Sequence, residues 1–126
     1  MTEIFATKIA KAEDWQDYKA LRRSALSKSP DVFCADGEDK FKTDAEWIKH
    51  FYTLRQDGHI VLIAYQGNKA VGMAGGKPNP YQSEAFILHS LWVEPEYRGK
   101  QVAKLLTADH MTHAQEKGYN PECKGY

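Results

Sequence analysis

The sequence has 126 residues, of which 42% are hydrophobic and 27% are charged, and this balance predicts a single globular domain over 1–126. Lysine plus arginine and aspartate plus glutamate each number 17, so the net charge lacks the basic excess that is typical of nucleic-acid-binding domains. No apolar run approaches the ~20 residues that span a bilayer, and the charged N-terminus does not resemble a secretory signal, so we expect a cytoplasmic protein that binds neither nucleic acid nor membrane.

The first half of the chain predicts one short strand and two helices. Residues 4–9 alternate as a strand does, and 13–27 predict a helix that ends at Ser29-Pro30-Asp31, because proline cannot continue a helix. Thr43 and Glu46 form a capping-box pattern that opens a second helix, which runs to about residue 55. Each helix has an apolar face at spacings of three and four, made by Trp15, Tyr18, Leu21 and Ala25 in the first and by Trp47, Ile48, Phe51 and Leu54 in the second.

The second half predicts three strands followed by a helix. Gly67-Asn68 is a hairpin signal, Pro78-Asn79-Pro80 predicts a loop, and Glu94-Pro95 ends a strand. Residues 119–126 are short and turn-like, so no further strand is expected. The order of elements implies an α/β (α+β) fold with a mixed, mostly antiparallel sheet flanked by helices, the strands lying at 60–65, 70–76 and 84–93 and the helix at 101–118.

The stretch 91–106 carries the clearest chemistry. A strand ends at a proline, and a turn containing Gly99, flanked by Arg98 and Lys100, leads directly into a helix. The first turn of a helix has backbone N–H groups without an internal partner, and the helix dipole places partial positive charge there. These features predict an anion site suited to phosphate, while a generic strand–turn–helix unit has the same ingredients.

The same stretch resembles the acetyl-CoA motif of the GNAT N-acetyltransferases, in which a strand is followed by Val-x-Pro-x-x-Arg-Gly-x-Gly-x-Gly/Ala and a Leu-Leu pair. The residues that match are Val93, Pro95, Arg98, Gly99, Ala103, Leu105 and Leu106. The resemblance implies a GNAT-like acyl-CoA N-acyltransferase fold that transfers the acetyl group of acetyl-CoA to the primary amine of a small molecule or peptide. It also implies the residues that bind acetyl-CoA: backbone amides of Arg98, Gly99, Lys100, Gln101, Val102 and Ala103 for the pyrophosphate, and Leu91, Trp92 and Val93 for the pantetheine arm.

The chain departs from the family pattern at two points. Gln101 stands where the family has a glycine; at ordinary helical dihedrals its N–H still points at phosphate, so we expect weakened CoA binding, with a site that has lost its ligand as the alternative. The family fold continues past this helix with a strand, a helix and a hairpin, so the resemblance implies that the C-terminal part is missing. Tyr119 and Tyr126 lie too near the helix end to take the role of the family's acidic tyrosine.

His89 and Glu84 are the candidate catalytic bases. Alternation along the strand places His89 on the face of Ile87, Leu91 and Val93, unless a bulge intervenes. Histidine titrates near neutral pH and can accept a proton from an amine, and in some GNAT members a histidine at this position lies near the acceptor. The alternatives are a structural histidine with a satisfied hydrogen bond and, for Glu84, a solvated charge at the strand's start.

Other candidate ligands give weaker signals. The remaining histidines form no ligand set, and Cys34 and Cys123 have neither metal nor disulfide spacing, so we expect no metal and two plain thiols. The resemblance implies that the first two helices and the loop between them shape the acceptor pocket, where Phe33 and Phe41 could line it.

Two other functions stay open: a non-catalytic CoA-binding or interaction module of the same fold, and a shortened chain completed by a partner subunit. Without a following strand, 84–93 would expose an edge that invites pairing, and Leu88, Leu91 and Val93 would be partly wet. We therefore expect a homodimer formed through this strand or the helix after it.

Overall fold

A computed structural model describes residues 4–29, 41–79 and 81–122. Within these ranges five strands form one sheet in sequence order. The first four strands pair antiparallel and the fifth pairs parallel with the fourth, which confirms a mixed, mostly antiparallel sheet. The strands are β1 (Ala6–Ile9), β2 (Ile60–Gln66), β3 (Lys69–Asn79), β4 (Gln82–Val93) and β5 (Asn120–Glu122).

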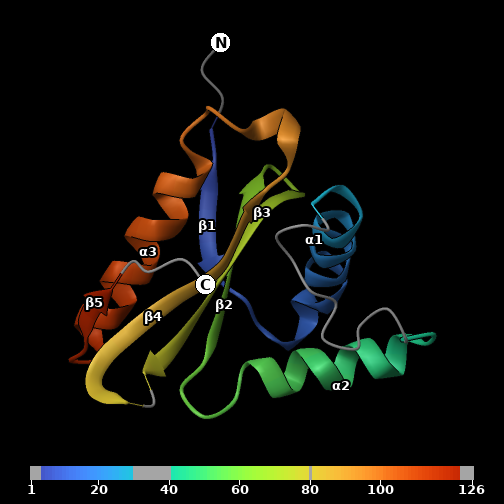
Figure 1. Ribbon diagram of the computed structural model, residues 1–126. Coiled ribbons are helices and arrows are strands. Elements are labelled where there is room, and N and C mark those ends of the chain that lie inside the picture. Colours follow the sequence, from blue (N-terminus) through green and yellow to red (C-terminus); the bar gives the residue numbers. More distant parts are fainter. Residues whose placement is uncertain (1–3, 30–40, 80, 123–126) are drawn as a thin grey trace.

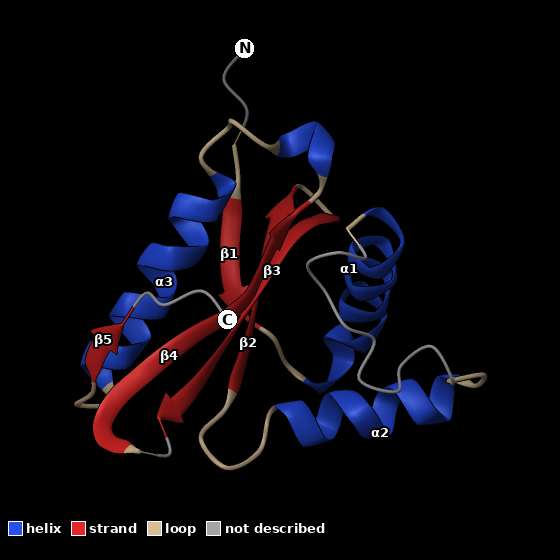
Figure 2. Ribbon diagram, viewed as in Figure 1, coloured by secondary structure: helices blue, strands red, loops and turns tan. Residues whose placement is uncertain are grey.

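Helices cover both faces of this sheet (Figure 1). The helices α1 (Trp15–Lys28) and α2 (Asp44–Leu54) lie on one side, and α3 (Val102–Glu116) lies on the other. Figure 2 shows the sheet as the middle layer between them. None of the helices in the described ranges is both long and apolar enough to cross a membrane. The expectations for Phe33, Cys34, Cys123 and Tyr126 concern residues outside the described ranges.

Each face of the sheet has its own apolar cluster. On the side of α1 and α2, Tyr18, Leu21, Trp47 and Phe51 pack against Val61, Ile63, Met73 and Trp92. On the side of α3, the buried residues are Leu62, Ala64, Val71, Ala74, Leu88, Val93, Val102 and Leu106. Burying apolar side chains on both faces is the main source of the fold's stability.

The predicted helices of the first half are confirmed, with one inward residue wrong. The side chain of Thr43 accepts a hydrogen bond from the N–H of Glu46 (3.3 Å), as a capping box requires, although Glu46 reaches back to the N–H of Lys42. Ile48 was expected inward and is 44% exposed. Successive helical residues are about 100° apart, so burial of Trp47 turns its neighbour outward.

The third strand is longer than predicted. Residues 78 and 79, expected in a loop, lie in β3 and pair with β4. The pairing of β2 with β3 begins at Ile60 and Gly76, so Pro78 lies beyond the end of β2. Proline is tolerated there because the missing N–H faces no strand on that side.

A strand follows α3, so the expectation of none after Gly118 is wrong. Gly118 has φ +83°, and this left-handed glycine ends the helix. The chain then forms β5, whose residues Asn120–Glu122 pair parallel with Ala85–Ile87 of β4. A three-residue strand that contains a proline has no alternating pattern, but it can form at a sheet edge because proline is tolerated there.

Two residues of β4 that were expected to be partly exposed are buried. Leu88 and Val93 are 5% and 6% exposed, and both belong to the cluster on the α3 side. Leu91, the third residue expected to be partly exposed, is 37% exposed. The described chain thus covers most of the surface that was expected to be open.

Candidate active site

A β-bulge divides β4 at Ser90. Gly75 pairs with His89 and Met73 pairs with Trp92, so two steps along β3 match three steps along β4. Such an extra residue defines a bulge, and Ser90 takes the left-handed conformation (φ 54°), which is uncommon for a residue with a side chain.

The bulge changes which side chains share a face with His89. Before it, His89 faces α1 and α2; after it, Trp92 packs on that side and Val93 packs on the α3 side. The expectation that His89 shares a face with Leu91 and Val93 is therefore wrong, because one extra residue shifts the alternation of all that follow.

His89 lies in a cavity of about 250 Å³ between the sheet and the helices α1 and α2. Opposite it on β3 is Gly75, and a Cβ there would lie only 2.3 Å from Cε1 of the imidazole. The ring thus occupies the space that any side chain at position 75 would fill. The described residues that line the cavity are Tyr18, Arg22, His50, Leu54, His59, Ile60, Val61, Met73, Ala74, Gly75, Lys77, His89 and Ser90.

The environment of His89 keeps its imidazole neutral. Burial lowers its pKa to about 4, with further contributions from the charges of Lys77 and His59. Nδ1 of His89 lies 3.0 Å from Oγ of Ser90, a hydrogen bond that orients the ring. A neutral, oriented imidazole can accept a proton at neutral pH.

The structure does not bring Glu84 to this cavity. Glu84 is exposed near the start of β4 and is not among the residues that line it. The two base candidates therefore stand apart, and His89 alone faces an enclosed space.

The turn before α3 presents backbone donors. The N–H of Leu105 donates to the carbonyl oxygen of Gln101 (3.1 Å), which is the N-cap position of α3. The N–H groups of Val102, Ala103 and Lys104 precede this ladder, as in the first turn of any α-helix. They point out of the helix beside a partial positive charge, which suits the pyrophosphate expected at this turn.

Gln101 does not adopt ordinary helical dihedrals, so the condition under which its N–H was expected to point at phosphate is not met. It is the N-cap of α3, with φ 70° and ψ 18°, and Gly99 two residues earlier also has a positive φ, +80°. A left-handed position favours glycine, which has no Cβ to clash. The family's glycine at this point therefore has a conformational reason, and glutamine carries strain in its place.

Arg98 fastens this turn to the end of β4. Its Nε donates to the carbonyl oxygen of Val93 (2.9 Å), and its guanidinium lies 5.7 Å from the ring centroid of Trp92. Trp92 and Val93 have buried side chains, so only their backbone can meet a ligand. The expected CoA-binding residues thus follow one another along the chain from the end of β4 to the first turn of α3.

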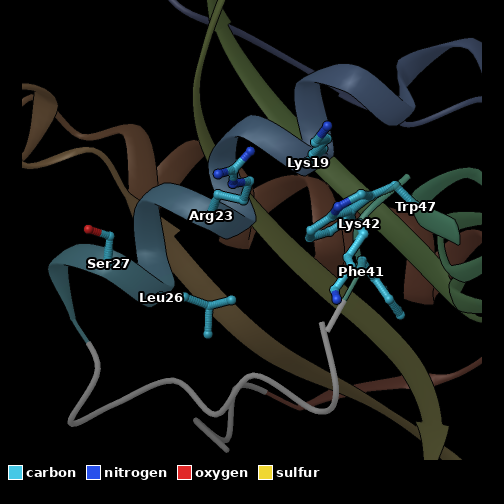
Figure 3. A pocket seen from close by; sticks show the side chains of 7 residues that line it. All are labelled: Lys19, Arg23, Leu26, Ser27, Phe41, Lys42 and Trp47. Carbon is cyan, nitrogen blue, oxygen red and sulfur yellow. The ribbon is translucent and has the colours of Figure 1, made fainter. Parts of the chain in front are cut away.

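A second, larger cavity of about 570 Å³ lies between α1 and the segment that leads into α2 (Figure 3). No residue of β4 lines it, so it is separate from His89. Phe41, expected to line a pocket shaped by the first two helices and the loop between them, lines this cavity and lies 5.2 Å from the rings of both Trp47 and His50. The lining residues are Lys19, Arg23, Leu26, Ser27, Phe41, Lys42 and Trp47.

The C-terminal half of α1 is linked to the end of β4 through Glu94. Oε1 of Glu94 accepts hydrogen bonds from Oγ of Ser24 (2.9 Å) and Nζ of Lys28 (3.0 Å). The N–H of Glu94 donates to the carbonyl oxygen of Val71 (2.9 Å). One carboxylate therefore joins the helix that lines both cavities to the strand that leads to the turn.

Sequence reasoning missed four residues of the site: Ser90, Gly75, His59 and Lys77. A glycine inside a strand pattern signals close backbone approach, so the Gly75-Gly76 pair could have pointed to a contact. Ser90 follows His89 directly in the chain, but its role depends on the bulge, and His59 and Lys77 become neighbours of His89 only through strand register, which the sequence does not specify by itself.

Comparison with known proteins identifies the family of this fold. The model of the acetyltransferase (GNAT) family matches residues 15–123, whereas no curated protein sequence matches the chain.

Several solved structures share the fold. An aminoglycoside acetyltransferase from an uncultured soil metagenomic sample has a TM-score of 0.72 and 17% identity, with 97% of this chain and 76% of that chain covered. The structure of AAC(6')-Iy with a CoA-S-monomethyl-acetylneamine bisubstrate analogue has a TM-score of 0.73 and 17% identity, over 98% and 79%. Glucosamine-6-phosphate N-acetyltransferase from Arabidopsis thaliana has a TM-score of 0.69 and 16% identity, over 98% and 82%. The chain belongs to the acetyltransferase (GNAT) family.

Proposed function

We propose that this chain is an N-acetyltransferase that transfers the acetyl group of acetyl-CoA to a primary amine bound beside His89. The observation that carries the proposal is the cavity at the bulge of β4: His89, with its lowered pKa, and Ser90 both line it, and the same strand leads through residues 94–101 to α3. Family membership supports acetyltransferase activity in general, and a similar structure was solved with a CoA bisubstrate analogue.

The residues present fit coenzyme A. The first turn of α3 offers unpaired N–H groups to a pyrophosphate, and the exposed Lys100 and Lys104 add positive charge nearby. In the described chain β5 pairs with β4 only as far as Ile87, so the backbone of Leu91–Val93 has no β5 partner. Its N–H and C=O groups are suited to the amides of a pantetheine arm.

The chemistry follows from where His89 lies. Acetyl-CoA supplies the activated acetyl thioester. His89 accepts the amine proton as the amine nitrogen bonds to the acetyl carbon, and the carbon–sulfur bond breaks to release CoA, whose thiolate takes a proton from solvent. A backbone N–H of the bulged strand donates to the carbonyl oxygen, where negative charge develops. Ser90 holds the imidazole in place, and Glu84 has no role in this scheme.

A second candidate, a CoA-binding module without catalysis, is favoured by the strained Gln101 in the turn. The expected homodimer was assigned to β4 or to the helix after it; because the open edge of β4 is assigned here to pantetheine, we propose α3 as the contact, where Leu105 and Met111 are exposed. Light scattering across a concentration series tests the dimer, and a monomer at every concentration contradicts it.

The test of the proposed function measures thiol release from acetyl-CoA over a panel of primary amines. We expect release that depends on one class of amine, with the acetylated product identified by mass spectrometry. Calorimetry with CoA and with dephosphorylated pantetheine separates the alternatives. Arg98→Glu should weaken CoA binding by about 1–3 kcal/mol, the scale of a charge-assisted hydrogen bond, without the same loss for pantetheine.

The outcomes are distinct. CoA binding with no acetylation of any amine favours the module. Equal affinity for CoA and pantetheine in the unmodified chain contradicts the assignment of the turn to the pyrophosphate.

A further inference from the structure

The cavity beside His89 is lined by basic side chains, and none of its described lining residues is a carboxylate. An acceptor amine reaches an enzyme mostly as a cationic ammonium at neutral pH. A cation in a basic cavity is repelled, because like charges at close range raise each other's energy. The basic lining residues are Arg22, His50, His59, Lys77 and His89.

Strand register places two of these residues side by side. Ile60 pairs with Gly76; His59 immediately precedes Ile60 and Lys77 immediately follows Gly76, so extending the antiparallel register by one residue brings the two close together. Side chains directly opposite on antiparallel strands have Cβ atoms about 5 Å apart. Both side chains line the cavity, where one oxygen-bearing anion could contact both.

This pair lies one step along the sheet from His89. Lys77 pairs with Ile87 on β4, and Gly75 pairs with His89. Residues two apart on a strand face the same side and are about 7 Å apart. Gly75, Lys77 and His89 all line the cavity, so a small molecule bound in it can extend from Lys77 to the imidazole. Arg22 also lines the cavity but makes other contacts, so the anion is assigned to His59 and Lys77.

We propose that the acceptor is a small primary amine that also carries an anionic oxygen group, a carboxylate or a phosphate, which Lys77 and His59 bind while His89 faces the amine. This inference rests on the proposed N-acetyltransferase function and names the class of its acceptor. It separates this chain from relatives whose names specify aminoglycosides, because a polycation meets no described carboxylate in the cavity.

Size and proton affinity agree with this class. The cavity of about 250 Å³ is smaller than the ~300–1,000 Å³ of pockets that hold drug-sized ligands, and it suits an amino acid or an aminoalkyl phosphate. Lys77 and His59 both lower the pKa of His89. A bound anion offsets their charge and raises that pKa toward neutrality, where a general base works best.

The first experiment compares matched amines on the full chain with CoA bound. The pairs are glycine against glycinamide and 2-aminoethyl phosphate against ethanolamine, with neamine as the polycationic probe. Binding is followed by the imidazole NMR signals of His59 and His89, and acetylation by thiol release. We expect the anionic member of at least one pair to bind about tenfold tighter or more, the scale of a charge-assisted contact. The two pairs distinguish a carboxylate from a phosphate.

The second experiment removes the positive charge of Lys77, to which we assign the preference for the anionic amine. Lys77→Met should abolish the difference within the preferred pair, and Lys77→Glu should reverse it. Lys49→Met is the matched control, because Lys49 is exposed on α2 and does not line the cavity; the preference should persist. Melting temperatures of the three variants verify that each is folded.

The results separate this inference from the function on which it rests. No preference in the unmodified chain, tighter binding of neamine, or a preference that survives Lys77→Met overturns the anionic acceptor. Acetylation of neutral amines without preference keeps the transferase and overturns the inference. If the anionic amines bind more tightly but none is acetylated, the anion site is supported and the proposed transferase function is contradicted.

Discussion

The two faces of the sheet differ in how completely they are filled. On the α3 face, Leu62, Ala64, Val71 and Leu106 are all fully buried. On the α1 and α2 face, the cluster around Trp47 and Phe51 fills one end, and the cavity of His89 occupies the other. Both faces thus bury an apolar cluster, and the face of α1 and α2 also holds the candidate chemistry.

Two adjacent glycines of β3 show this difference at a single point. A Cβ on Gly75 would strike the His89 ring, whereas a Cβ on Gly76 would come within 2.6 Å of the ring of Phe86. Successive residues of a strand face opposite sides. The same lack of a side chain therefore makes room for a candidate base on one face and for core packing on the other.

The largest expected effect is on the open face. His89→Gln should lower turnover by about 10²–10⁴-fold, the contribution of a general base, while the melting temperature at neutral pH changes little because the ring lies in a cavity. Steady-state kinetics with the acceptor found in the screen provide the measurement. A variant that keeps its rate returns His89 to a structural role.

On the filled face, Phe86→Ala should lower the free energy of unfolding by about 3–5 kcal/mol, the range for truncating a buried aromatic residue. Phe86 is fully buried and stacks on His110. Urea unfolding measures the loss. If the folded variant also loses affinity for the acceptor, the two faces are not independent.

The glycine pair sharpens the comparison. Gly75→Ala should displace His89 and lower kcat by about 10- to 100-fold, because a misplacement of about 1 Å can cost that much. Gly76→Ala should leave kcat nearly unchanged and destabilise the fold by about 1–3 kcal/mol through overpacking. Equal losses of kcat in both variants would contradict the separation.

The pH dependence of stability tests the surroundings of His89. Its pKa is about 4 when folded against an ordinary 6.5, so between these values the unfolded chain binds more protons and stability rises with pH. The contribution is fully present above pH 6.5 and is lost as the pH falls toward 4. Urea unfolding at pH 7 and pH 5 measures the free energy of unfolding of the unmodified chain and of His89→Gln. The loss of stability between pH 7 and pH 5 should be larger in the unmodified chain. Equal losses in the two proteins contradict the lowered pKa of His89.

The smallest expected effect is at Gln101. Gln101→Gly removes the strain of a side-chain-bearing residue in the left-handed conformation, which is about 1–2 kcal/mol. Glycine also makes the unfolded chain more flexible, and this lowers stability by about 0.5–1 kcal/mol. The net result should be a slightly higher melting temperature, with tighter CoA binding if the side chain obstructs the turn. Lys104→Gly at an exposed position within α3 should destabilise instead. A lower melting temperature for Gln101→Gly would show that the turn is not strained.

Much of the fold could be predicted because local patterns carry it. The apolar stripe that contains Tyr18 and Leu21 and the cap at Thr43 specify their helices within a few residues of sequence. Gly67-Asn68 specifies a hairpin in the same way. The turn before α3 could be located because its glycine and flanking cations are adjacent in the chain.

What could not be predicted depends on partners that are distant in sequence. The bulge at Ser90 exists because β3 and β4 pair out of step, and β5 forms because β4 offers it an edge. The neighbours His59 and Lys77 follow from the register of β2 and β3. The conformation of Gln101 is set by the turn that it closes, against the preference of its own side chain.

Glu94 gives the two halves of the site a common anchor. Its carboxylate is held by Ser24 and Lys28, and its backbone leads directly into the turn at the start of α3. In mechanical terms, this carboxylate, whose side chain is 15% exposed, is a tie between the helix that lines both cavities and the segment that leads to the α3 turn.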